Sequence, residues 1–162
     1  MLTIQIQRPT FDLTSYIQRL EREALNTISF AALEYITTSL SIIPVYGGAS
    51  HATFTALADA AGVPLSISPR ARDTQAQGIA TSDGGIDSNN NRYSFTYETT
   101  LPHLNVNERE NANQFGFNLT NPGPYNFRSI AGSAAENVLE SFAGVNPLAH
   151  ISVSSSTVRI NI

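Results

Sequence analysis

One long helical pattern dominates the first quarter of this chain. Between Leu13 and Leu40, apolar residues recur every three or four positions, as they do along the buried face of an α-helix. The first stripe is Leu13, Ile17, Leu20, Ala24, Ile28, Ala31 and Tyr35, and a second one is Leu25, Leu33, Ile36 and Leu40. Asp12 or Thr14 can cap the start of this helix. A helix from Asp12 to Leu40 would be roughly 40 Å long, so we expect one end to project from the domain or to pack against a neighbour.

Two shorter helices are predicted further along the chain. The first runs from about Ala52 to Ala61, with Ser50 as its N-cap and Gly62 at its end. The second runs from about Asn126 to Phe142 and ends before Gly144. Its expected buried face consists of Ile130, Ala131, Ala134, Ala135, Val138, Leu139 and Phe142.

Short runs of alternating apolar and polar residues predict the strands. They centre on Ile4, Leu65, Phe95 and Phe117, and the last two lie in the aromatic runs 93–97 and 115–119. At the C-terminus, residues 151–153 and 158–162 flank a serine turn and predict a β-hairpin. The expected fold is a single α+β domain over residues 1–162: the long N-terminal helix and two shorter helices pack on a small, mainly antiparallel sheet that includes this hairpin. Its expected core includes Leu20, Ile28, Leu57, Phe95, Phe117, Val138 and Phe142.

The segment from about residue 70 to 91 is predicted to be a flexible polar loop. It offers almost no apolar side chain to a core, and residues 82–91 read Ser-Asp-Gly-Gly-Ile-Asp-Ser-Asn-Asn-Asn. Asp83 and Asp87 could donate oxygen ligands to calcium, but the order of ligands differs from an EF-hand. We expect the loop to become ordered against a neighbouring molecule.

No residue pattern points to catalysis, and we expect no cofactor and no metal. The chain has no cysteine, its three histidines lack metal-ligand spacing, and it has neither a nucleophile elbow nor a phosphate loop. The net charge of −4 argues against specific nucleic-acid binding. No stretch has the length and hydropathy of a membrane span, and the N-terminus does not resemble a signal peptide. All nine basic residues are arginine, a composition that favours contact surfaces over bulk-exposed ones.

Several segments, in order, resemble tailed-bacteriophage neck and tail-completion proteins, which connect head and tail. The long helix leads into a Pro-Val-Tyr-Gly-Gly turn at 44–48 and a second helix that contains Phe54. The aromatic strand at 93–97 is followed by Leu-Pro-His-Leu at 101–104 and by Asn107-Glu108. The resemblance implies a virion protein that is assembled in the host cytoplasm, forms a ring, and contacts portal-side and tail proteins.

From this resemblance we expect a non-enzymatic structural subunit at the head–tail junction. A tail-terminator ring subunit is the nearest alternative, and a small ligand- or glycan-binding module that uses the 83–91 loop is an alternative of another class. The charges of the long helix and the polar loop are the expected contacts with neighbours. These candidate interface residues are Arg19, Glu21, Arg22, Glu23, Arg70, Arg72, Asp83 and Asp87.

Overall fold

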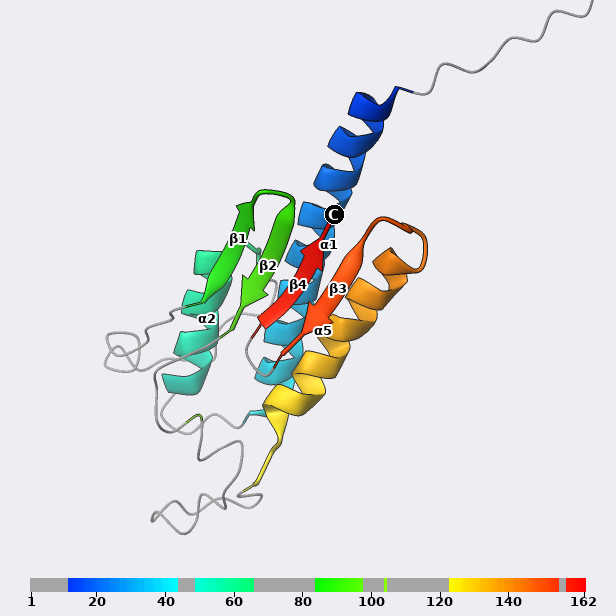
Figure 1. Cartoon of the computed structure of the whole chain (residues 1–162). Helices are drawn as coiled ribbons and strands as arrows, with labels where there is room; N and C mark the ends of the chain where they lie inside the picture. Colours follow the sequence, from blue (N-terminus) through cyan, green and yellow to red (C-terminus); the bar gives the residue numbers. More distant parts are fainter. Residues whose placement is uncertain (1–11, 44–48, 66–83, 98–103, 105–122, 155–156) are drawn as a thin grey trace, which may run out of the picture.

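The computed structural model describes residues 12–43, 49–65, 84–97, 104, 123–154 and 157–162 (Figure 1). Within these ranges the helices are α1 (Leu13–Ile42), α2 (Ala49–Ala61) and α5 (Phe127–Ala143). The strands are β1 (Gly85–Asn89), β2 (Arg92–Thr96), β3 (His150–Val153) and β4 (Thr157–Asn161). They form one antiparallel sheet in the order β1-β2-β4-β3. The predicted α+β class, the long N-terminal helix and the C-terminal hairpin are therefore confirmed.

Helix α1 begins at a capped N-terminus that lies beyond the sheet. The Asp12 carboxylate accepts hydrogen bonds from the backbone amides of Thr14 (3.1 Å) and Ser15 (3.3 Å). The hydroxyl of Ser15 also donates to it, and this bond is the main reason why the pKa of Asp12 is lowered. Figure 1 shows the first turns of α1 extending past the sheet, as the length of the helical pattern predicts.

The three described helices lie on one face of the sheet and enclose the core with it (Figure 1). Tyr35 of α1 lies at the centre of this core. Its ring stacks on Tyr97 at a centroid distance of 4.0 Å and meets Phe95 at 5.9 Å and Phe54 of α2 at 6.3 Å. Predicted core residues Leu20, Ile28, Leu57, Phe95 and Phe142 are buried, and Val138 is partly buried against them.

Part of the segment predicted to be flexible is instead a β-hairpin, so that prediction is wrong for residues 84–91. Strand β1 pairs with β2 from Gly85↔Thr96 to Asn89↔Arg92, which leaves Asn90 and Asn91 as the turn. Both have positive φ angles, 47° and 60°. Two-residue hairpin turns of type I′ need positive φ at both positions, and asparagine tolerates this better than most residues. The backbone pairing therefore orders a segment with few apolar side chains.

Smaller corrections concern three residues in the helices. Ser50 lies inside the first turn of α2 rather than at its N-cap, because the helix begins at Ala49. Ile130 and Leu25 were expected on buried faces, but they are exposed, Ile130 by 49%. No other described element covers either side chain. The predicted strands at 2–6 and 115–119, including Phe117, lie outside the described residues, as does most of 65–67.

Candidate functional site

The face of the sheet that the helices leave open is uniformly polar. On β2, Tyr93 and Phe95 point into the core, so Arg92, Ser94 and Thr96 point to the opposite face, since side chains alternate along a strand. On β4, Val158 and Ile160 are buried in the same way. Their neighbours Thr157, Arg159 and Asn161 therefore join the open face. No described helix covers this face, which we call the open sheet face.

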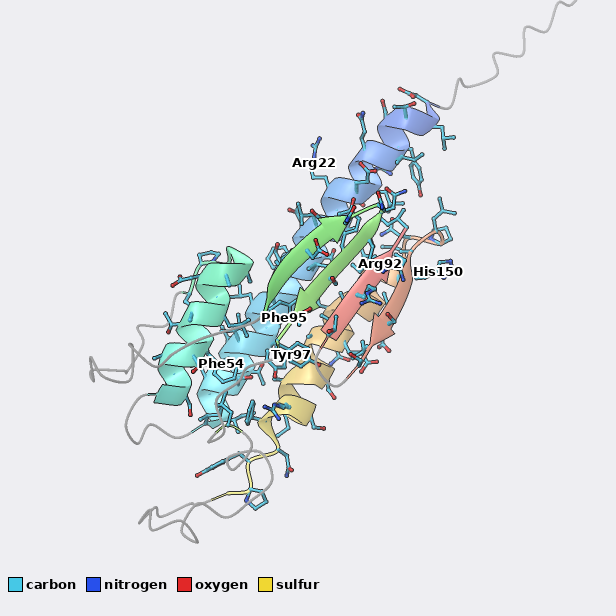
Figure 2. All side chains as sticks on the ribbon, turned by 60° about the vertical axis from the view of Figure 1, so that its left-hand side comes forward. Arg22, Phe54, Arg92, Phe95, Tyr97 and His150 are labelled. Atoms are coloured by element: carbon cyan, nitrogen blue, oxygen red, sulfur yellow. The ribbon has the colours of Figure 1, made fainter. Side chains whose placement is uncertain are left out.

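Strand register orders these side chains into two rows that cross all four strands. One row runs Asp87, Ser94, Arg159 and Ser152, and the other runs Asn89, Arg92, Asn161 and His150. Each row thus carries one arginine on a central strand. In Figure 2, Arg92 and His150 lie toward the end of the sheet where α1 projects, whereas Phe95 and Tyr97 lie nearer its other end.

The open sheet face carries positive charge on a chain that is acidic as a whole. Arg92 and Arg159 against Asp87 give the two rows a formal charge of +1, whereas the chain carries −4. Neither arginine forms an ion pair with another described residue. Among the described residues, the buried Nε of Arg159 has no hydrogen-bond partner. An unpaired buried donor on a charged group is costly, and because this Nε is buried, an acceptor from another molecule would have to bind the exposed part of the half-buried side chain.

The four charged residues predicted to form a cluster on α1 lie on different sides of the helix. Arg19 and Glu23 form the expected i, i+4 ion pair at 3.5 Å, and both side chains are exposed. The guanidinium of Arg19 also lies 5.5 Å from the centre of the Tyr16 ring. Arg22 is exposed, whereas Glu21 is half-buried and close enough to raise the pKa of Tyr93, a shift caused mainly by burial of that ring. Only Arg19, Arg22 and Glu23 are therefore available as a contact patch.

The remaining candidate interface residues fall into two groups. Arg70, Arg72 and Asp83 lie outside the described residues. Asp87 is exposed in β1, where it pairs with Ser94 and belongs to the open sheet face. The ligand-binding alternative places its site on the 83–91 segment, and over residues 84–91 that segment is a paired hairpin.

Sequence reasoning missed Arg92, Arg159 and His150 as members of one surface. The signal was present, because every second residue of the predicted strands at 93–97 and 158–162 is polar. What the pattern could not supply was the strand order. Only the pairing of β2 with β4 brings Ser94 beside Arg159 and Arg92 beside Asn161.

The described residues do not assemble a metal site or an acid–base pair. No group of three His, Cys, Asp or Glu side chains among them is placed to hold a metal ion. Asp87 and His150 lie on β1 and β3, at opposite edges of the sheet, so they are roughly 14 Å apart at about 4.8 Å per strand. The glutamates at 98, 108 and 110 and His103 lie outside the described residues.

Two other polar groups of kinds that can carry chemistry have structural roles here. The Nε2 of His51 is 3.1 Å from the carbonyl oxygen of Ile43, and because a carbonyl only accepts, Nε2 must carry the proton. This bond ties the first turn of α2 to the end of α1. The Tyr97 hydroxyl donates to the carbonyl oxygen of Ser154 at 2.8 Å, and burial raises its pKa.

Comparisons with protein-family models, with curated proteins and with solved structures found no match to this chain. None of the described helices has the length and apolar character needed to cross a membrane. The arguments for function therefore come from the residues and surfaces of the chain itself.

Proposed function

We propose that this chain is a non-enzymatic structural subunit of a tailed-bacteriophage virion, located at the head–tail junction between the portal-side connector and the tail. The observation that carries the proposal is the projecting end of α1. The apolar stripe that is buried at Leu20 and Ala24 continues to Ile17, which is half-buried, and to Leu13, which is 56% exposed. The first turns of α1, which extend past the sheet in Figure 1, thus present an apolar stripe that no other described element covers.

Exposed charges on another side of α1 offer a second means of contact. Arg19, Arg22 and Glu23 lie within two turns of Ile17 along the helix, but because the helix turns once every ~3.6 residues, Arg19 and Arg22 lie on the side away from the apolar stripe. Arginine is enriched at contact surfaces between proteins. The resemblance to neck and tail-completion proteins indicates where this contact would form, at the head–tail junction. It also implies a ring of identical subunits, in which exposed surfaces of one copy are covered by its neighbours.

Deleting the coding sequence from the phage genome tests this function. We expect the deletion to yield DNA-filled heads and separate tails, visible by electron microscopy, because a junction subunit is needed only to join the two. Supplying the wild-type chain from a plasmid should restore joined particles. Joined, infectious particles in the absence of the chain would contradict the proposal.

The charged part of α1 gives a second prediction. The double variant Arg19→Ala/Arg22→Ala should weaken assembly or attachment to the partner while leaving the melting temperature of the isolated chain nearly unchanged. An exposed ion pair such as Arg19–Glu23 contributes under about 1 kcal/mol, whereas an arginine that becomes buried at an interface can contribute more than about 2 kcal/mol.

Gln18→Ala is the matched control, because it changes an exposed neutral residue on the same turns. Assembly is measured by light scattering of the purified protein and by incorporation into particles, and melting by circular dichroism. Normal incorporation of the double variant would mean that α1 projects into solvent without contacting a partner through these residues.

A further inference from the structure

We propose that copies of this chain associate head to tail, with the open sheet face of one copy docked on the α1–α5 side of the next. This inference rests on the proposed function, since it specifies how identical subunits contact each other sideways. The projecting end of α1 is then free for a different partner. The evidence is a difference in charge between the two sides of the domain.

The side of the domain opposite to the open sheet face is acidic. From Leu25 to Ile42, α1 carries one charged residue, Glu34, and from Ser129 to Ala143, α5 carries Glu136 and Glu140. These stretches contain no basic residue, so their formal charge is −3, and Arg128 in the first turn of α5 brings the total to −2. Glu34 and Glu140 are exposed, and none of the three glutamates forms an ion pair with a described residue.

The open sheet face offers the complementary charge. Arg92 and Arg159 lie on its two central strands, and no described carboxylate pairs with them. Arginine binds carboxylates in a bidentate manner, and complementary charge across an interface fixes partner and orientation. A glutamate of the next copy would bind the exposed part of the half-buried Arg159 side chain, because its Nε is buried and out of reach.

Apolar side chains on the helix side support the same interface. Phe30 is 62% exposed and Ile130 49% exposed, on the two helices that carry the glutamates. Aromatic residues are enriched at the centres of interfaces, with charged residues at the rim. On the open sheet face, Ser94 is paired with Arg159, and Thr96 is paired with Thr157 in the next row, so the side chains on that side of Arg159 are small.

This contact is heterologous, because it joins two different surfaces of the same chain. Such contacts repeat from copy to copy, and they form a closed ring when the rotation between neighbours closes, or a filament when it does not. The geometry therefore predicts an assembly larger than a dimer, with a mass that falls as salt screens the charges.

A charge swap tests the interface. The sheet variant Arg92→Glu/Arg159→Glu makes both surfaces acidic, and the helix variant Glu34→Arg/Glu140→Arg makes both basic. We expect each variant alone to associate at least tenfold more weakly than the wild type in light scattering at low salt. Mixing the two variants should restore the large assembly, because each then meets a surface of opposite charge. The chain that carries all four changes should also assemble by itself.

Two controls keep the result interpretable. Asp59→Arg changes an exposed charge on α2, away from both surfaces, and should leave association unchanged. If Arg159→Glu disturbs folding because this side chain is half-buried, Arg92→Glu alone provides the sheet variant, since Arg92 is exposed.

The outcomes separate this inference from the proposed function. A wild type that stays monomeric at all accessible concentrations overturns the interface, and so do variants that keep the wild-type mass or a mixture that fails to restore it. None of these results decides where the chain acts, because the head–tail joining defect of the deletion is measured independently.

Discussion

Phe95→Ala should lower the free energy of unfolding by about 3–5 kcal/mol, the range observed when a fully buried aromatic ring is truncated. Phe95 is 0% exposed at the centre of β2. Its ring meets Tyr35 edge-on at 5.9 Å and lies 5.7 Å from Tyr97. The truncation removes these contacts and leaves a cavity where α1 packs on the sheet.

Phe30→Ala is the matched control, because it removes the same group from a side chain that is 62% exposed. Exposed substitutions away from caps and special backbone positions change stability by about 0.5 kcal/mol or less. Both variants are compared by urea unfolding at a concentration where the protein is monomeric. A near-neutral Phe95→Ala would mean that the inward and outward residues of β2 are exchanged, since a shift of one residue reverses the two faces of a strand.

The parts of the fold that were predictable depend on dense local patterns. The repeat of Leu20, Ala24, Ile28 and Ala31 along α1 specifies a helix and its buried side. The alternation of Tyr93, Phe95 and Tyr97 specifies a strand and the side that faces the core. The ion pair of Arg19 and Glu23 follows from their spacing on one helix. In each case the pattern lies within a short segment of the chain, so it can be recognised in a single sequence.

The missed features depend on contacts between distant segments. Strand β1 has a weak pattern of its own, and it exists because its backbone pairs with β2 across the Asn90–Asn91 turn. Ile130 is apolar and at helical spacing, but none of the described elements covers it, so it is exposed. Apolar spacing gives the direction of a side chain and not the presence of a neighbour to bury it.

The open sheet face, too, was predictable only in part. That Arg92 and Arg159 face away from the core follows from alternation within each strand. That they lie on neighbouring strands depends on the pairing of β2 with β4, which joins residues more than 60 positions apart. The acidic stretches of α1 and α5 are visible in the sequence, but only the packing of both helices on one face of the sheet makes them opposite to the arginines.

Gly84→Ala is expected to destabilise the fold by about 1–3 kcal/mol, the typical cost of adding a methyl group where there is no room for it. A Cβ at Gly84 would collide with the carbonyl oxygen of Thr96 and would lie 2.6 Å from Cδ1 of Leu57. Leu57 is fully buried in α2, and Thr96 is held in β2 by its pairing with Gly85 and Thr157. Because one obstacle is backbone within the sheet, it can move only if the β1–β2 pairing is disturbed.

Gly132→Ala should have the opposite sign, which makes the pair a sharp test of packing. Gly132 lies in the middle of α5 and is buried, yet an added Cβ would meet only the Tyr97 hydroxyl, at 3.9 Å, an ordinary contact. Alanine favours a helix over glycine by about 0.5–1 kcal/mol, so this variant should unfold at higher urea concentration than the wild type while Gly84→Ala unfolds at lower. The same methyl group is added to a glycine in both, so general effects of the substitution on the unfolded chain are shared. A Gly84→Ala variant as stable as Gly132→Ala would show that β1 does not pack against α2 as closely as described. The described position of β1, which carries Asp87 at the edge of the open sheet face, would then be contradicted as well.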